Sequence, residues 1–447
     1  MSAVELVDLA IETADDAGAS AADAVVIEWT SSAAQVRLGE VETVKMSRER
    51  RLGVRCFAGN ASAMASTADL TADAVRAFVH DVVEMARIVA PDPDAGLPPG
   101  HELASDHPDL GLADLAGDAI SPDERVDLAM RCEEAALAVD PRLTNSEGAE
   151  FSNSSSRIAY GASTGFRGAY ETTGYSLSVA PVATEGEQMQ RDSWYDSTRA
   201  YAKLASPADV GRRAAERTLR RLHARKVPTQ SVPVVFDPIT AASLMRHLAS
   251  AVCGGALYHR ASFLLDKLGE DVAAPTVTVV DDGRLPGGLA SRPFDGEGLA
   301  TRRNVIIDQG RLSGYLLDSY AARKLGRTAT GSAARSAGDA PSASPTNFHL
   351  VAGSHTPEEI VASVDRGLYV TGLSGFGVNG VTGDYSRGAS GLWIEKGELT
   401  HAVEEVTIAG NLLEMFNRIE MIGSDLEFRS SICAPTLLIG RMTVAGS

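Results

Sequence analysis

The sequence is poor in cysteine and in aromatic residues, and these shortages bear on which classes of protein it can belong to. Its 447 residues include only four cysteines, and no two of them form a C-x-x-C pair. They are Cys56, Cys132, Cys253 and Cys433. This wide spacing predicts free thiols in a reducing compartment rather than a disulfide framework. Aromatic residues make up 5% of the chain, but the apolar fraction of 44% is ordinary for a soluble globular protein.

Long apolar runs and an excess of positive charge are also missing. No stretch approaches the roughly 18 apolar residues of a membrane-spanning helix, so we expect no membrane partner. The first residues, Met1 to Leu6, carry an acid and do not resemble a signal peptide, which predicts a cytoplasmic protein. Asp and Glu outnumber Lys and Arg by 59 to 41, a net charge of −18. Because non-specific nucleic-acid binding needs Lys and Arg to neutralise phosphates, we expect no nucleic-acid partner.

Metal-ligand clusters and hydrolase motifs are missing as well. The nine histidines include no pair one turn apart on a predicted helix, whereas zinc needs three or four convergent ligands. No G-x-S-x-G lies between a strand and a helix, so a Ser-His-Asp hydrolase has no candidate nucleophile. The sequence therefore predicts no catalytic residue and no metal ligand in this chain.

Two pairs of acids stand in glycine-rich turns. Asp281 adjoins Asp282, and Asp295 lies two residues before Glu297. A cation site at 295–298 is one interpretation. Acids in such segments more often cap a turn, and we favour the turn.

Length and periodicity predict an α+β protein of two domains, 1–226 and 227–447. The first is expected to combine helices with an antiparallel sheet, and the second to be β-rich with few helices. Five prolines make the segment 90–120 an expected exposed connection within the first domain.

The elements of the first domain follow from local patterns. Helices are predicted at 4–17, 67–89, 121–139 and 206–224. Short strands are predicted at 24–29, 35–38, 41–45, 52–57 and 61–65, with a strand-rich block at 143–201. Ser121, followed by Pro122 and Glu124, is a strong helix start.

The predicted helix 206–224 is basic. Its arginines and the one that follows are Arg212, Arg213, Arg217, Arg220, Arg221 and Arg225. A nucleic-acid contact is one interpretation. We favour a solvated face on an acidic protein, because charge runs usually keep a face wet.

A glycine-dense stretch stands out near the end of the chain. Seven glycines fall between Gly372 and Gly391. Glycine allows close backbone approach, so the stretch suits irregular loops and a strand edge that a peptide can reach. Gly375, Gly377 and Gly380 also spell G-x-G-x-x-G, but no helix start follows, which disfavours a dinucleotide site. A surface loop without a role is the alternative.

This stretch resembles the TldD/PmbA family, also called modulators of DNA gyrase, and in particular its PmbA (TldE) branch. The resemblance covers nearly the whole chain, with further matching segments at 144–152, 294–303 and 316–325. It implies a heterodimer with a TldD-like subunit that holds zinc and encloses a chamber. The implied substrates are peptides and unfolded segments, including the leaders of modified peptides.

The resemblance also locates the helix that carries zinc in catalytic members, which have His-Glu-x-x-x-His there. The matching helix is 238–253, where the ligand positions fall at Met245 and Ser250 and the glutamate position at Arg246. None of these can take the family role, so no cofactor is expected in this chain. Cys433 lies near the family's ligand cysteine but too close to the last strand to match it.

A chamber-facing role is expected for part of the glycine-rich stretch. The expected peptide-facing residues are Asn379, Gly380, Thr382, Gly383, Asp384, Tyr385 and Arg387. Asp384 and Arg387 either contact the peptide or only brace the loop. Trp393, in a predicted strand at 391–395, is expected to pack in the core.

We therefore interpret the chain as a non-catalytic metallopeptidase subunit that shapes a chamber and positions peptide by strand addition. Two other functional classes stay open. One is a stand-alone hydrolase with an unrecognised site around Asp384, Tyr385 and Arg387. The other is a homodimeric peptide-binding or scaffold protein.

Overall fold

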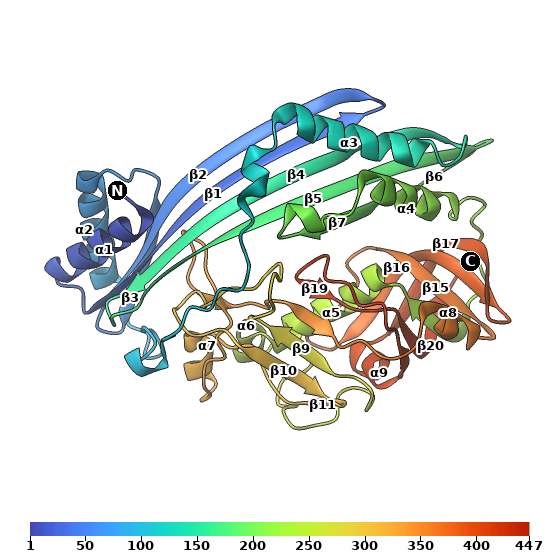
Figure 1. The fold of residues 1–447 in the computed structure, drawn as a ribbon. Coiled ribbons are helices and arrows are strands. Elements are labelled where there is room, and N and C mark those ends of the chain that lie inside the picture. Colours follow the sequence, from blue (N-terminus) through green and yellow to red (C-terminus); the bar gives the residue numbers. More distant parts are fainter. Residues whose placement is uncertain (447) are drawn as a thin grey trace.

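A long antiparallel sheet of seven strands forms the N-terminal part of the protein. The computed structural model describes residues 1–446. The strands are β1 (Ala21–Arg37), β2 (Glu40–Ala58), β3 (Ala61–Thr67), β4 (Leu143–Ala162), β5 (Arg167–Glu185), β6 (Gln188–Arg191) and β7 (Trp194–Thr198). Their order is β3-β2-β1-β4-β5-β6, and β7 pairs with β5. Figure 1 shows the sheet curving above the C-terminal half.

The short strands expected from the sequence merge into longer ones. The segments expected at 24–29 and 35–38 are both part of β1, and those at 41–45 and 52–57 are both part of β2. Leu38 and Gly39, with φ of 51° and 75°, form the tight turn between β1 and β2. Such a left-handed pair matches the twist of the flanking strands.

Four helices cover one face of this sheet. Helices α1 (Ala3–Asp16) and α2 (Ala72–Ile88) pack together at one end, and α3 (Pro122–Leu137) and α4 (Pro207–Leu219) cover the other. The predicted capping box of Ser121 and Glu124 is present in α3.

Alternation along β1 divides its side chains between two cores. Ala24 and Val26 pack in the cluster of α1 and α2, whereas Val25 and Ile27 join the cluster that contains Phe294 of the C-terminal half. Because successive side chains of a strand point to opposite faces, the sheet lies between its own helices and the second domain.

The C-terminal half is built from three smaller sheets. The six-stranded one has the order β17-β16-β15-β8-β20-β18, and β17 also pairs with β20, which closes five of the strands into a ring. Its strands are β8 (Gln230–Phe236), β15 (Arg366–Ser374), β16 (Asp384–Glu395), β17 (Glu398–Asn411), β18 (Ile419–Ile422) and β20 (Leu437–Ala445).

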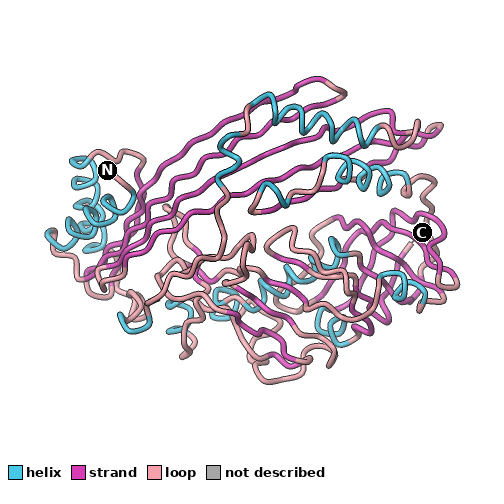
Figure 2. Tube along the Cα trace, viewed as in Figure 1, coloured by secondary structure: helices cyan, strands magenta, loops and turns pink. Residues whose placement is uncertain are grey.

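A five-stranded sheet, β11-β10-β9-β14-β19, and a two-stranded sheet, β12-β13, complete this half. They consist of β9 (Val279–Asp282), β10 (Arg303–Asp308), β11 (Arg311–Leu312), β12 (Ala333–Ala334), β13 (Ser342–Ala343), β14 (Phe348–Leu350) and β19 (Ile432–Cys433). The helices are α5 (Pro238–Val252), α6 (Gly254–Tyr258), α7 (Ser319–Lys324), α8 (Pro357–Ala362) and α9 (Leu412–Asn417). Figure 2 shows that long loops join many of these elements. The predicted α+β class is confirmed.

The segment between α2 and α3 crosses from one half of the molecule to the other. It contains only two 3₁₀ turns, Gly100–Glu102 and Leu115–Ala119. The carbonyl of Leu110 accepts a hydrogen bond from the amide of Gly287, and Leu112 accepts one from Thr173. Leu110 and Leu112 are buried, so this segment packs against the rest of the protein and is not a wholly exposed connection.

The basic helix α4 also differs from expectation. Arg212 is exposed beside Asp209 and Glu216, as a solvated face would require. Arg217, however, is buried, where it donates to Asp237 at 3.0 Å and to the carbonyl of Thr371. The expected solvated face is therefore wrong for Arg217, which joins α4 to the C-terminal half.

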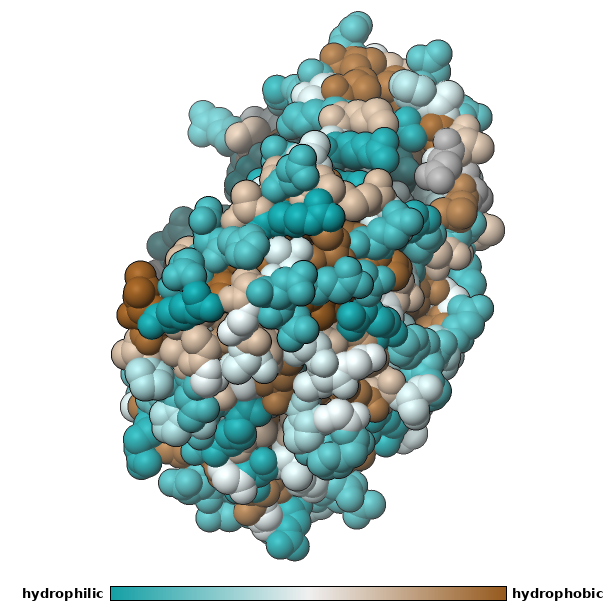
Figure 3. Space-filling view, turned by 90° about the vertical axis from the view of Figure 1, so that its left-hand side faces the viewer, coloured by the Kyte–Doolittle hydropathy of each residue, from teal (hydrophilic) through white to brown (hydrophobic). Residues whose placement is uncertain are grey.

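The surface mixes polar and apolar residues. Figure 3 shows the end that bears α1 and α2, where hydrophilic residues are interspersed with small hydrophobic patches. Within residues 1–446 no helix is both long and apolar enough to span a bilayer.

Candidate functional site

The glycine-rich stretch forms the end of β15, a loop at 375–383 and the start of β16. The amide of Ser386 donates to the carbonyl of Gly377 at 2.6 Å, and the amide of Asn379 donates to the carbonyl of Asp384 at 2.8 Å. The carbonyl of Gly380 accepts from Phe263, which ties the loop tip to the segment after α6. The loop is thus a hydrogen-bonded hairpin with a defined position.

Most glycines of this stretch are needed by the backbone itself. Gly383 has φ of +81°, which side chains disfavour, and a Cβ on Gly377 would meet the carbonyl oxygen of Ser386 at 2.0 Å. Gly380 is different, because it is exposed and a Cβ there would come no closer than 3.6 Å to the carbonyl oxygen of Ala261. Gly380 is therefore the position where a missing side chain leaves room for something outside the loop.

A polar cluster braces the loop. The side-chain oxygen of Asn379 accepts from the amides of Val381 and Thr382. The hydroxyl of Thr382 donates to Asp384 at 2.6 Å, and Asn411 donates to the other oxygen of Asp384 at 3.4 Å. These contacts, that of Thr382 first, lower the pKa of Asp384, so the carboxylate is ionised.

The seven expected peptide-facing residues do not share one environment. Gly383 and Tyr385 are buried, and the Tyr385 hydroxyl has no hydrogen-bond partner among the described residues. Arg387 donates to the carbonyl of Ser374 at 3.2 Å, and no ion pair joins it to Asp384 within the described chain. Only Gly380 and Arg387 of the seven line the depression described next.

This depression, of about 300 Å³, lies between the loop and helix α5. Its walls include His247 and Ser250 of α5, together with Phe376, Gly380 and Arg387 of the glycine-rich stretch. Phe376 is fully exposed at its rim. An exposed phenylalanine beside a hollow is a feature that binding surfaces share.

His247 is the polar side chain that the sequence did not single out for a role. Its ring lies 6.2 Å from that of Tyr385, and its Nε2 is buried without a partner in the described part of the chain. Burial lowers the pKa of His247, and the nearby Arg387 and Arg246 lower it further. The ring is therefore neutral at pH 7. Its helix position carried no pattern that could have revealed this.

The donor set of α5 does not fit a zinc ion. Met245 is fully buried in the core, Ser250 donates to the carbonyl of Arg246, and Arg246 is exposed. Among the side chains that the structure describes, no group of three His, Cys, Asp or Glu is placed to hold a metal ion. One neutral imidazole flanked by two arginines cannot supply tetrahedral coordination.

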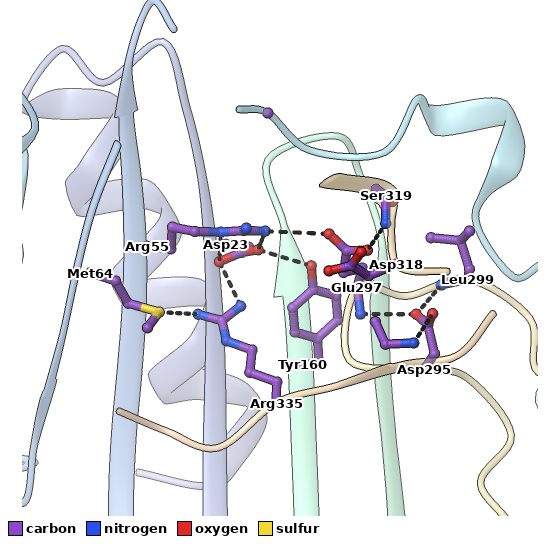
Figure 4. A network of polar contacts seen from close by, with 12 residues as sticks. Asp23, Arg55, Met64, Tyr160, Asp295, Glu297, Leu299, Asp318, Ser319 and Arg335 are labelled. Carbon is purple, nitrogen blue, oxygen red and sulfur yellow. Dashed lines mark hydrogen bonds and ion pairs between the residues drawn. The ribbon is translucent and has the colours of Figure 1, made fainter. Parts of the chain in front are cut away.

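A second polar site lies between the two halves of the molecule (Figure 4). Asp23 of β1 is fully buried and accepts from Arg55 of β2 at 2.5 Å and from Arg335 at 2.6 Å. The hydroxyl of Tyr160 donates to the same carboxylate at 3.2 Å. Burial alone would raise the pKa of Asp23, but Arg335 and Arg55 together lower it. We call Asp23, Arg55, Tyr160 and Arg335, with Glu297 at 3.9 Å from Arg55, the interdomain network.

The acids at 295–297 belong to a turn, as we favoured. Asp295 accepts from the amides of Glu297, Leu299 and Ala333, and Glu297 accepts from the amide of Ser319 at 2.8 Å. Burial and then Glu297 raise the pKa of Asp295 to about 7. Both acids therefore hold backbone in place next to the interdomain network.

Three consecutive stretches match the PmbA/TldA metallopeptidases. Residues 22–86 match domain 1, 116–222 the central domain and 229–446 the C-terminal domain of that family. Strands from the first two stretches share the seven-stranded sheet.

Relatives extend this match over nearly the full length. Metalloprotease PmbA of Escherichia coli O157:H7 is 39% identical over 442 residues, which are 99% of this chain and 96% of that one. A metalloprotease PmbA homologue of Haemophilus influenzae is 36% identical over 447 residues, 99% of this chain and 96% of that one.

Solved structures share the fold. A proposed modulator of DNA gyrase from Bacteroides thetaiotaomicron superposes with a TM-score of 0.92 at 29% identity, over 99% of this chain and 98% of that one. TldE from Thermococcus kodakarensis superposes with a TM-score of 0.89 at 21% identity, over 99% of this chain and all of that one, which speaks for the fold alone.

Proposed function

The chain belongs to the PmbA/TldD metallopeptidase family, and we propose that it is the non-catalytic, TldE-like subunit of a two-chain zinc metallopeptidase. The observation that carries this proposal is helix α5. By the sequence resemblance it corresponds to the family's zinc helix, yet Met245 is in the core and the described residues place no three-donor group near it. The partner would be a TldD-like chain that holds the zinc and performs the hydrolysis.

In this role the chain contributes a wall of the chamber and positions peptide. Phe376, Gly380 and Arg387 line one side of the hollow beside α5. Exposed backbone at Gly380 lets an extended peptide approach closely, while the charge of Arg387 suits a peptide carbonyl or carboxylate. The substrates would be peptides and unfolded segments, because an extended chain is what such a hollow can align.

The cysteines support a cytoplasmic setting. All four are free, and Cys56, Cys132 and Cys433 are buried. Unpaired buried thiols are the usual state in a reducing compartment.

The test is cleavage of an unfolded polypeptide by the chain reconstituted with a TldD-like subunit from the same organism. Gly380→Val should lower the cleavage rate about tenfold or more, because the added side chain holds the peptide backbone away. Gly100→Val is the matched control, since Gly100 is also exposed and a Cβ there would lie 3.5 Å from the nearest atom. If Gly380→Val and Asp384→Ala both cleave at the wild-type rate, the loop does not serve the substrate.

Zinc analysis tests whether the partner, and not this chain, holds the metal. The purified chain should hold no stoichiometric zinc, and the reconstituted pair should hold the zinc of the partner alone. About one tightly bound zinc in this chain by itself would contradict the non-catalytic assignment. Cleavage by the chain without a partner would instead favour a stand-alone hydrolase.

A further inference from the structure

A second and larger cavity, of about 810 Å³, lies where the N-terminal sheet meets the C-terminal half. Helix α6 separates it from the hollow at the glycine-rich loop, because Ala256 lines that hollow while Gly255 and Tyr258 line this cavity. Cavities of this size between domains are common places for ligands.

Two strand edges border the cavity. Ser62 and Met64 belong to β3, an edge strand of the seven-stranded sheet. The outer side of β3 pairs with no described strand. Antiparallel pairing leaves the amide and carbonyl of every second residue facing away from the neighbour, so β3 has unused hydrogen-bonding groups on that side. Ser342 and Ala343 of β13 line the opposite side. A segment of extended chain is the ligand that such edges bind best.

Arg55 lies in the wall of the cavity and has one free donor. Arg55 is about nine-tenths buried, and its Nε and Nη2 donate to Asp23 at 3.4 and 2.5 Å. Arg55 lines the cavity, and its Nη1 has no hydrogen-bond partner among the described residues. The guanidinium lies 5.1 Å from the ring of Phe57, and with Asp23 this fixes its orientation. A fixed guanidinium with a free N–H is a good donor to a carboxylate.

Both acids that line the cavity already have partners. Asp92 accepts from the hydroxyl of Tyr320 and pairs with Lys324 at 3.2 Å. Asp318 caps α7 through the amide of Ala321, and burial raises its pKa to about 6.

We propose that this cavity binds the C-terminal end of a short extended peptide, with its backbone along β3 and its terminal carboxylate on Nη1 of Arg55. The small side chains that line it, such as Ala63, Ala95 and Ala343, leave room for different residues, so binding tolerates different sequences. This inference rests on the proposed role in peptide handling and adds a site on the far side of α6.

Fluorescence anisotropy tests the inference on the full chain. The probe is tetra-alanine with an N-terminal fluorophore, made once with a free C-terminus and once as the C-terminal amide. The free acid should bind roughly tenfold or more tightly than the amide, because only the acid makes a charge-assisted hydrogen bond. Equal binding of the two probes would overturn the assignment to Arg55.

A filled cavity gives the second measurement. Ala343→Trp should abolish binding of the free acid, and Ala138→Trp, on the exposed end of α3, should bind it as the wild type does. Wild-type affinity in Ala343→Trp would overturn the proposal. Gly380→Val should leave this affinity unchanged while it slows cleavage, so failure at the cavity and failure at the glycine-rich loop give different results.

Discussion

The glycine-rich loop and the interdomain network hold their polar groups in opposite ways. In the loop, Asn379, Thr382 and Asp384 bond to one another within a few positions of the chain, and all three are exposed. In the network, Asp23 and Arg335 are 312 positions apart and both side chains are almost fully buried. Water replaces a lost contact in the first case and cannot in the second.

This difference separates the part of the molecule that can adapt to a ligand from the part that holds the two halves together. An exposed hydrogen bond can be exchanged for one to a peptide at little cost, whereas a buried charge must keep its partner. Substitutions in the two regions should therefore differ in which property they change. The network should govern stability, and the loop should govern activity.

Asp23→Ala should have the largest effect. It leaves Arg55 and Arg335 buried without their shared carboxylate, which should cost roughly 3–5 kcal/mol of unfolding free energy in a urea titration. Asp8→Ala is the control, because Asp8 forms an ion pair with Arg167 at 2.5 Å that is partly exposed, and its loss should cost less than about 1 kcal/mol. Equal losses in the two variants would contradict the contrast between buried and exposed pairs.

Trp393→Ala tests the strand that anchors the glycine-rich stretch. Trp393 is 4% exposed and lies in the main core of the C-terminal half, as expected from the sequence. The truncation should destabilise the protein by roughly 3–5 kcal/mol through the cavity it leaves. Trp29, which is 40% exposed, gives the comparison, and Trp29→Ala should shift a thermal melt far less. A melt that Trp393→Ala leaves unchanged would show that this strand does not support the loop.

Asp281 gives a prediction for pH. It accepts from the amide of Thr346 at 2.6 Å, its second oxygen has no partner in the described chain, and burial raises its pKa from 3.8 to about 6. Asp281 therefore binds more protons in the folded state than in the unfolded state between these values, so its contribution to the unfolding free energy should fall as pH rises from about 4 to about 6.

Asp281→Asn should remove roughly 1–3 kcal/mol of this fall, measured by urea unfolding at pH 4 and pH 7. The amide group satisfies the site without a charge, so the variant should be at least as stable as the wild type at pH 7. Asp295, whose pKa burial also raises, to about 7, should keep part of the slope. An unchanged difference between the two pH values would contradict the assignment to Asp281.

Asp384→Ala should have the smallest effect on stability. It removes exposed contacts to Thr382 and Asn411, so the expected loss is below about 1 kcal/mol. The same urea titration measures it, with Asp23→Ala as the reference. A loss comparable to that of Asp23→Ala would make the loop a stability element, contrary to its proposed role.

Some of the candidate site could be predicted from the sequence and some could not. The glycine-rich stretch does lie against helix α5, and the family resemblance is confirmed over nearly the whole chain. The expectation that seven residues share one face was too simple, because Gly383 and Tyr385 are buried. Strand alternation alone cannot say which face of β16 meets the core.

The sequence by itself determined the features that depend on neighbours a few positions away. The helix start at Ser121, the tight turn after Arg37 and the packing position of Trp393 all follow from such local chemistry. The tertiary structure alone decided the merging of short strands into the long sheet, the burial of Arg217 and the cavity beside Arg55. Each of these depends on groups that are distant in the chain, and a charged side chain is stable in the interior only where folding brings its partner to it.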